Sequence, residues 1–250
     1  MNVIACIARV PDTATRIRIA ADEKTIASDG VQYVINPYDE IALEEAVGFR
    51  DAHGGSLIVL HVGAEDFQKD LRQCLAKGAD QAIHLKTDGP LGPSGVAEIL
   101  AAEIQPFLPA TIFCGKQSVD GDVGGTGTML AYRLDLPVVS KISTFEVTGD
   151  TATCTREIEG GVETVTTSLP AVLTCEKGLN EPRRAGLKDI MAAKKKPLEV
   201  KDAQAPTTKL VLESLQLPPE RPEGRIVGEG VEAVPILVDL LTNEAKVIQQ

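Results

Sequence analysis

The sequence has no tryptophan, and five phenylalanines and three tyrosines make up only 3% of its 250 residues. Proteins that bind single-stranded nucleic acid stack the bases on aromatic side chains, and this chain has few of them. Its formal net charge is −11, with 36 acidic against 25 basic residues, which disfavours contact with a phosphate backbone. We therefore expect no nucleic-acid partner.

The cysteines and histidines of the sequence do not have the spacing of metal ligands or of redox-active pairs. None of the five cysteines forms a CxxC pair, and His53, His61 and His84 stand apart from one another. This pattern predicts no metal site, and reduced, buried cysteines in a cytoplasmic protein. The cysteines are Cys6, Cys74, Cys114, Cys154 and Cys175.

Long apolar runs and catalytic motifs are missing as well. No apolar run approaches the roughly 20 residues that cross a bilayer, so we expect no membrane-embedded segment. The run Met1–Ala8 has no basic flank before it, and Arg9 follows at once, which favours a first strand over a signal peptide. There is no GxSxG motif and no histidine beside a candidate nucleophile. We therefore expect no catalytic residues, and a protein that is not an enzyme.

Short apolar runs alternate with helical patterns through the first half of the chain. This alternation predicts right-handed βαβ units and a parallel sheet, an α/β fold of the Rossmann-like type. In the helix expected from Asn36 to Gly54, Asn36 is the N-cap and Pro37 lies in the first turn. The expected strands are 2–8, 56–62, 81–85 and 110–114, and the other expected helices are 66–77, 94–107 and 122–134.

The second half of the chain has a different sequence pattern. Three Thr- and Val-rich runs joined by Gly-containing turns predict an added antiparallel section, and 170–174 is expected to be another strand. We divide the chain into a domain at 1–196 and a proline-rich C-terminal arm at 197–250. The remaining expected elements are a weak hairpin of 16–19 with 31–35, the antiparallel strands 141–147, 151–158 and 161–168, and helices at 185–193 and 231–248.

A glycine-rich turn, GKQSVDGDVGGTGT at 115–128, follows the strongest strand and leads into a helix. Such a turn presents free N–H groups and a positive dipole end, which suit a phosphate. It matches neither GxGxxG nor GxxxxGK[ST], so a purely structural turn is the alternative. The strand ends 5–9 and 62–63 and the helix start 36–39 should meet it at the edge of the sheet. Asp120 and Asp122 are expected to cap the following helix rather than to bind a metal.

A second informative segment begins at Cys175. Leu179 stands among polar and charged residues, and it either folds back onto its own domain or projects as an anchor into a partner's pocket. The next residues are basic: seven Lys or Arg against two acids between Arg183 and Lys201. On an otherwise acidic chain, this stretch indicates an interaction segment.

Six motifs occur in an order that resembles the beta (small) subunit of the electron transfer flavoproteins. They are VPDT, NPYDEIALEEAV, GADQAIHL, CGKQSVDGD followed three residues later by TG, LPAVLT, and LNEPRRAGLKDIMAAKKKP. Together they extend over most of residues 1–200. The last motif is highly specific, because no argument from periodicity would place those residues together.

The resemblance implies a heterodimer that carries electrons from flavoprotein dehydrogenases, such as the acyl-CoA dehydrogenases of fatty acid oxidation, to a membrane quinone oxidoreductase. The alpha subunit holds FAD, and the beta subunit holds a structural AMP on a fold like that of the adenine nucleotide alpha hydrolases. The C-terminal arm would pack on the alpha subunit. The implied AMP contacts are Cys6, Asn36, Pro37, Tyr38, Asp39, Val62, Gly115, Lys116, Gln117, Ser118, Val119, Asp120, Gly121, Asp122, Val123, Gly124, Gly125 and Thr126.

By the same resemblance, Thr13 and Tyr38 face the alpha subunit's flavin, and Leu179 is the anchor of a dehydrogenase-recognition loop. That loop comprises Cys175, Glu176, Lys177, Gly178, Leu179, Asn180, Glu181, Pro182, Arg183 and Arg184.

The glycine-rich loop departs from the family pattern. It reads DGDVGGTGTM, where the AMP-binding group usually has DDDxNQTGQM. Its DGD beginning resembles the electron-bifurcating group, which holds a second FAD in the equivalent site, whereas its TG-x-M ending resembles the AMP group. The resemblance therefore favours AMP, with bifurcation as one alternative and an independent nucleotide-binding protein as another.

Overall fold

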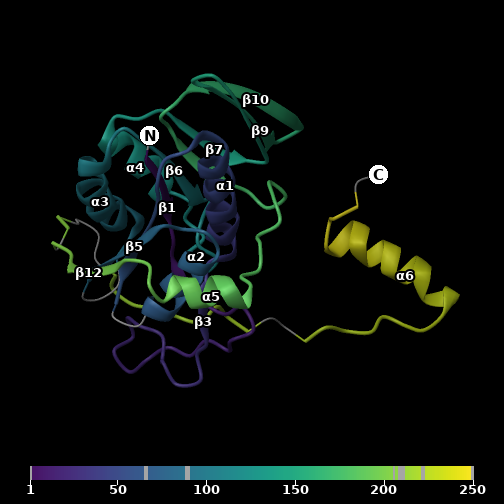
Figure 1. Cartoon of the computed structure of the whole chain (residues 1–250). Helices are drawn as coiled ribbons and strands as arrows, with labels where there is room; N and C mark the ends of the chain where they lie inside the picture. The colour runs from purple at the N-terminus through teal and green to yellow at the C-terminus, as the bar shows by residue number, and fades with distance from the viewer. Residues whose placement is uncertain are drawn as a thin grey trace. The chain divides into compact units, whose positions relative to one another are not determined.

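A sheet of seven parallel strands forms the centre of the first part of the chain (Figure 1). The computed structural model describes residues 2–64, 67–87, 91–204, 206–207, 212–220 and 223–248. Across the sheet the order is β12 (Leu198–Asp202), β5 (Gln81–Lys86), β4 (Leu57–Gly63), β1 (Asn2–Cys6), β6 (Ala110–Gly115), β11 (Val172–Cys175) and β7 (Val138–Ile142). The predicted α/β fold with a parallel sheet is confirmed.

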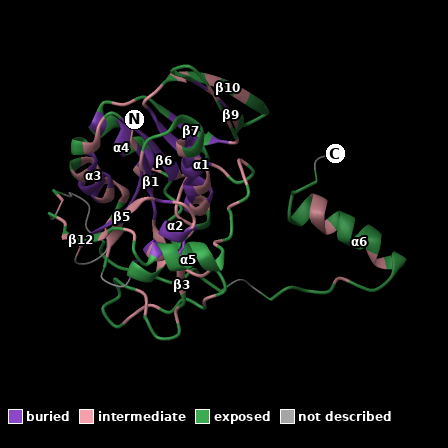
Figure 2. Cartoon of the chain, viewed as in Figure 1, coloured by how far each residue is buried: buried purple, intermediate pink, exposed green. Residues whose placement is uncertain are grey.

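Helices cover both faces of this sheet because successive strand side chains point to opposite sides. Val3 and Ala5 pack in one apolar cluster with the buried residues of α1 and α2, while Ile4 and Cys6 pack in a second cluster with α3 and α4. Both clusters lie against the sheet (Figure 2). The helices are α1 (Pro37–His53), α2 (Gln68–Ala76), α3 (Pro93–Ile104) and α4 (Thr126–Leu134).

The helix boundaries have local causes. In α1, Pro37 occupies the first position, acids lie in the first turn, and Gly54, with φ of 75°, follows the last turn. The helix predicted from 122 begins only at Thr126, because Asp122 and Gly124 take positive φ angles of 55° and 65° that no helix contains. The predicted 66–77 helix is α2, and Asp66 lies outside the described residues. The predicted 94–107 helix ends at Ile104 and continues as the 3₁₀ turn η2 (Gln105–Phe107).

The strand order fixes where a ligand would bind. From β1 the chain builds outward through β4 and β5 on one side, and then returns to β6 and β11 on the other. The order therefore reverses between β1 and β6, where Cys6 and Cys114 lie opposite each other in register. Open parallel sheets bind ligands at the carboxyl ends of strands at such a reversal.

The predicted antiparallel section is present as a separate sheet of β8 (Thr144–Thr148), β9 (Thr151–Ile158) and β10 (Gly161–Ser168). The predicted hairpin near the start has one wrong strand. β2 (Arg9–Pro11), not 16–19, pairs with β3 (Tyr33–Ile35), and an isolated bridge joins Ile19 to Ile26.

The main sheet extends past residue 197, where we divided the chain. β12 begins at Leu198 and pairs with β5 along the edge of the main sheet. The first compact unit runs from Met1 to Leu215, and the second from Gln216 to Gln250. The second unit contains η3 (Val231–Ala233), α6 (Val234–Asp239) and the π-helical turn η4 (Leu240–Glu244), so the helix predicted to reach Ile248 ends earlier.

All five cysteines are buried, and none is in a disulfide, as predicted. Among the described residues, we find no helix with the length and apolar character needed to cross a bilayer.

Candidate functional site

A buried carboxylate, Asp39, joins three predicted site segments. Asp39 lies in the first turn of α1, and its two oxygens accept hydrogen bonds from the backbone N–H groups of Ala8 and Gly115, both at 2.8 Å. These donors follow β1 and end β6, the two strands at the reversal of strand order. Burial raises the pKa of Asp39 to about 7, although its hydrogen bonds with Ala8, Asn36 and Gly115 oppose the rise.

Asn36 attaches the glycine-rich loop to the same helix start. Its side-chain amide donates to the carbonyl of Gln117 at 2.8 Å, and its side-chain oxygen accepts the N–H of Val119 at 3.2 Å. Asn36 was predicted to cap α1, but no side-chain cap bond is present there. Its polar atoms are used instead to hold residues 117–119 against the start of α1.

The glycine-rich loop is folded on itself. Asp122 donates its N–H to the carbonyl of Ser118 at 3.0 Å and pairs with the Gln117 side chain, while Asp120 accepts the N–H of Gly121 at 2.7 Å. The prediction that Asp120 and Asp122 cap α4 is therefore wrong, since both bond within the loop.

The loop leaves the N-terminus of α4 open. No side chain caps this helix in the described structure, and its first backbone bond runs from the Met129 N–H to the Gly125 carbonyl at 3.0 Å. The amides of Thr126 to Thr128 precede that bond, so they form a donor set at the positive end of the helix dipole. Val123 in the loop is 66% exposed. Such an end is suited to an anion.

Two buried histidines that the sequence analysis treated as isolated lie beside this edge. His61 and His84 face each other in register on β4 and β5, with ring centroids 5.2 Å apart. Burial lowers the pKa of His61 to about 3, so its neutral ring donates from Nδ1 to the Ile7 carbonyl at 2.8 Å. His84 contacts the Gly63 carbonyl at 3.1 Å. Each histidine lies in the second half of its strand, and this was the signal available in the sequence. The His84 contact helps to hold the Val62–Gly63 end in place.

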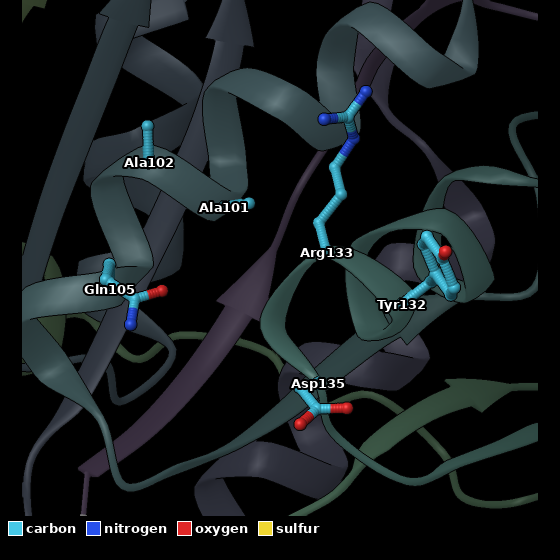
Figure 3. Close-up of a pocket in the computed structure, with 6 residues that line it drawn as sticks. All are labelled: Ala101, Ala102, Gln105, Tyr132, Arg133 and Asp135. Carbon is cyan, nitrogen blue, oxygen red and sulfur yellow. The ribbon is translucent and has the colours of Figure 1, made fainter.

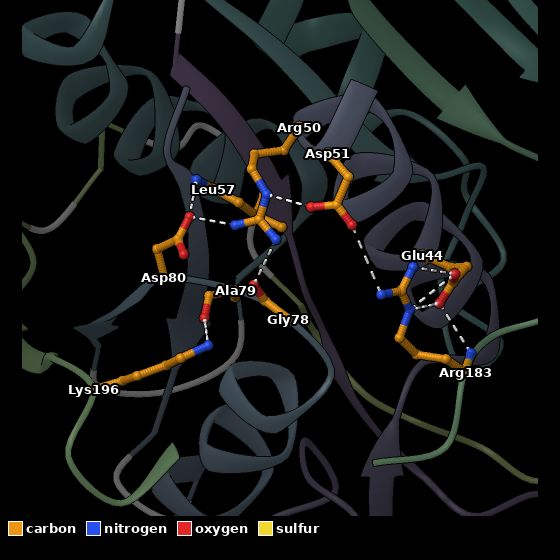
Figure 4. Close-up of polar contacts among 9 residues, drawn as sticks. All are labelled: Glu44, Arg50, Asp51, Leu57, Gly78, Ala79, Asp80, Arg183 and Lys196. Atoms are coloured by element: carbon orange, nitrogen blue, oxygen red, sulfur yellow. Dashed lines mark hydrogen bonds and ion pairs between the residues drawn. The ribbon is translucent and has the colours of Figure 1, made fainter. Parts of the chain in front are cut away.

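The predicted partner loop, 175–184, is fastened to the outer side of α1. Asn180 donates to the Glu45 carboxylate at 2.9 Å and to the Ile41 carbonyl at 3.1 Å. Arg183 makes a bidentate pair with Glu44, with contacts of 2.8 to 3.0 Å (Figure 4). Planar two-point pairing of this kind fixes orientation as well as position. The loop is therefore held by residues some 139 positions away in the sequence.

Leu179 is half-buried and packs against the first apolar cluster. Of the two alternatives left open by the sequence, the structure shows at least a partial fold-back onto its own domain. The apolar side chains of the following helix α5 (Leu187–Ala193) are more exposed: Leu187, Ile190 and Met191 are 79%, 45% and 56% accessible.

The cations of the basic segment, residues 183–201, fall into two groups: those that bond within the chain and those that are exposed. Arg183 pairs with Glu44, and Lys196 donates to the carbonyls of Leu75 and Ala79 at 3.0 and 2.6 Å. Figure 4 shows the Arg183–Glu44 pair and the Lys196–Ala79 bond. Lys201 pairs with Glu103 at 2.7 Å. These cations secure the fold. The exposed side chains of the segment that could meet a partner are Arg184, Lys188, Lys194 and Lys195.

The two residues predicted to face a flavin differ in their surroundings. Thr13 is exposed in the segment between β2 and β3. Tyr38 is half-buried beside Asp39, and the Lys116 ammonium lies over its ring, 4.7 Å from the centroid. A surface hollow lies elsewhere, at the C-terminal ends of α3 and α4, and none of the predicted site residues lines it (Figure 3). Its lining residues are Ala101, Ala102, Gln105, Tyr132, Arg133 and Asp135.

Comparison with known proteins gives a consistent result. The family model of the electron transfer flavoprotein domain matches residues 24–206. The chain is 37% identical to the electron transfer flavoprotein subunit beta of Bacillus subtilis (strain 168), over 99% of this chain and 100% of that protein. It is 38% identical to the same subunit of Mus musculus, over 90% of this chain and 91% of that protein. The corresponding Dictyostelium discoideum subunit is 34% identical over 98% of each chain.

Proposed function

The chain belongs to the electron transfer flavoprotein family as a beta subunit, and on that premise we propose a role for each of its parts. It pairs with an alpha subunit that carries FAD, holds AMP in the glycine-rich loop, and presents residues 175–184 to a flavoprotein dehydrogenase. Electrons from that dehydrogenase would leave the heterodimer for a membrane quinone oxidoreductase. The chain itself forms and breaks no bonds.

The observation that supports AMP is the open N-terminus of α4, reached through a loop that Asn36 and Asp39 hold against the strand ends. The first-turn amides of α4 would receive the phosphate, because they are unpaired donors at a positive helix end. Gly124 and Gly125 lack side chains that would obstruct its approach. The exposed carboxylates of Asp120 and Asp122 suit hydroxyl groups such as those of a ribose, since ionised carboxylates only accept hydrogen bonds.

The remaining steps concern the flavin and the partners. The FAD of the alpha subunit would supply the electron-carrying chemistry. Tyr38 and Thr13 would line one side of the space in which it moves, and the alpha subunit would cover the C-terminal unit, where Ile236 and Leu237 are exposed. An electron carrier must release each donor quickly, and weak encounter complexes of this kind use small interfaces.

The nucleotide content of the purified heterodimer tests whether this chain holds AMP. We expect one AMP and one FAD per heterodimer after acid extraction and chromatography, because the beta-chain site offers one phosphate-sized donor set. Two FAD and no AMP would instead assign the chain to the electron-bifurcating group, which the DGD start of the loop resembles. A colourless chain that binds ATP without any partner would contradict both, and would indicate an independent nucleotide-binding protein.

The role of Leu179 gives a second test. We expect Leu179→Ala to slow electron uptake from the partner dehydrogenase at least about fivefold, since loss of an apolar anchor costs more than about 1 kcal/mol of binding. Assembly with the alpha subunit should be unaffected. Stopped-flow bleaching of the dehydrogenase flavin at several carrier concentrations measures the effect.

Leu187→Ala is the matched control for this experiment, because Leu187 is a leucine on the neighbouring helix α5 with 79% exposure. Leu179 also packs against the apolar core, so the melting temperature of each variant must be recorded beside its rate. A lowered melting temperature with an unchanged uptake rate would assign Leu179 to packing alone.

A further inference from the structure

Lys116 is the one described residue whose side chain and backbone link the glycine-rich loop to the partner loop. It directly follows β6 and is the second residue of the glycine-rich loop, after Gly115. Its backbone N–H donates to the carbonyl of Cys175 at 2.9 Å, and its ammonium pairs with the Glu176 carboxylate at 2.7 Å. The same ammonium lies over the ring of Tyr38. Three predicted sites therefore meet at one side chain.

The two loops are otherwise attached at different places. The glycine-rich loop is held at the start of α1, by Asn36 and Asp39. The far part of the partner loop is held further along α1, where Asn180 and Arg183 bond to Glu45 and Glu44. The start of the partner loop is the end of β11, where Cys175 pairs with β6 and β7, and the first side chain beyond this strand, Glu176, pairs with Lys116.

The geometry of Lys116 also depends on the rest of the glycine-rich loop. A Cβ atom added at Gly124 would lie 3.3 Å from the Lys116 carbonyl oxygen, so the loop folds back closely over this residue. A ligand that orders residues 115–126 therefore restricts the backbone from which the Lys116 side chain projects. Glu176 is tied on its other side, through its N–H, to the Ile142 carbonyl at 3.0 Å.

We propose that Lys116 is a positioning residue that couples occupancy of the glycine-rich loop to the order of the partner loop, so that a bound nucleotide prepares the chain for its dehydrogenase. This inference rests on the proposed function, because it takes AMP as the ligand and residues 175–184 as the docking loop. It gives the structural nucleotide a role in recognition. Coupling of this kind requires that the ligand bias a connected element, and the Lys116–Glu176 pair supplies the connection.

The expected size of the coupling follows from the exposure of the pair. The Lys116 and Glu176 side chains are 18% and 22% accessible, so solvent screens their attraction only in part. An ion pair near a surface changes an equilibrium by about two- to fivefold. We therefore expect AMP to slow amide exchange in residues 176–179 by about two- to fivefold, and to slow it more strongly in residues 115–126.

Hydrogen exchange measured by mass spectrometry on the heterodimer, stripped of nucleotide and then supplied with AMP, tests the coupling. In the Glu176→Gln variant, AMP should still protect residues 115–126 but no longer 176–179, and the Lys116→Met variant should also lose the protection of 176–179. Lys116→Arg should restore the effect, because a guanidinium can pair with the carboxylate and stack on Tyr38. Lys69→Met is the control, since Lys69 is an exposed α2 lysine without an ion pair in the described structure.

The outcomes separate the coupling from the nucleotide proposal. Protection of 115–126 without protection of 176–179 in the wild-type protein would overturn the coupling and leave AMP binding intact. Equal protection of 176–179 in the wild-type, Lys116→Met and Glu176→Gln proteins would overturn the role of Lys116. Absence of AMP protection at 115–126 would overturn the nucleotide proposal, and the coupling with it.

Discussion

Gly115→Ala is expected to lower the stability of the chain by about 1–3 kcal/mol and to disrupt the nucleotide site together with it. A Cβ at this position would lie 2.7 Å from the Tyr38 Cβ and 2.8 Å from the Tyr38 carbonyl carbon, and would overlap a carboxylate oxygen of Asp39. Two of these three atoms cannot move without shifting α1. The added methyl therefore separates the end of β6 from the helix start, and the Gly115 N–H loses its bond to Asp39.

A melting temperature and an AMP titration measure this effect on the purified heterodimer. For a chain of this size, about 1 kcal/mol corresponds to a shift of roughly 2–4 °C. The matched control is Gly48→Ala, because Gly48 is exposed within α1 and an added Cβ meets nothing within 4 Å. Alanine there should raise stability by about 0.5–1 kcal/mol. A Gly115→Ala protein with normal melting and normal AMP affinity would contradict the close contact between β6 and α1.

The parallel core was predictable because its strands are buried on both faces. Runs such as 57–62 and 110–114 are apolar except for one polar residue each, His61 and Thr111, and the intervening helices carry the matching apolar period. β12 was missed for the converse reason. Its sequence LEVKD lies on the edge of the sheet, where residues with exposed side chains are tolerated, so no burial pattern marks it.

The site was predictable to the extent that it follows from topology. The carboxyl ends of parallel strands meet at one edge, which brings 36–39 and 115–119 together without knowledge of any contact. The bonds that hold this edge do not follow from sequence spacing. The Arg183–Glu44 pair joins residues 139 positions apart, and neither local propensity nor periodicity connects them. Likewise, the use of Asp120 and Asp122 inside their loop depends on the positive φ angle of Asp122.

Asp39→Asn is expected to destabilise the chain, with the largest effect in acid. The replacement keeps the shape of the side chain but turns one carboxyl oxygen, which can accept a hydrogen bond whether or not the group is protonated, into an NH₂ group that faces the N–H of Ala8 or Gly115. Two donors opposed in a buried site leave both unsatisfied, at a cost of about 1–3 kcal/mol. Because the two amides belong to the ends of β1 and β6, AMP affinity should fall as well.

The pH dependence of this cost has a definite sign. Burial raises the pKa of Asp39 to about 7 in the folded chain, against about 3.9 in an unfolded one. The stabilising contribution of this carboxyl is therefore complete below about pH 4 and is lost as the pH rises toward 7, since the unfolded chain releases the proton first. Asparagine does not titrate. Between pH 5 and pH 8, the difference in stability between the wild-type protein and Asp39→Asn should then be largest at pH 5, and it should narrow by about 1–3 kcal/mol by pH 7.

Thermal melts of the two heterodimers at pH 5, 6, 7 and 8 measure this difference, and contributions from the other ionisable groups cancel between them. Asp150→Asn is the control, because Asp150 is an exposed residue in the β8–β9 turn and should give a difference within about 0.5 kcal/mol at every pH. A gap that stays constant from pH 5 to pH 8 would mean that Asp39 is already ionised in the folded chain over this whole range. The two amide donors would then outweigh burial, and the edge between β1 and β6 would be held by a charge rather than by a proton-bearing carboxyl.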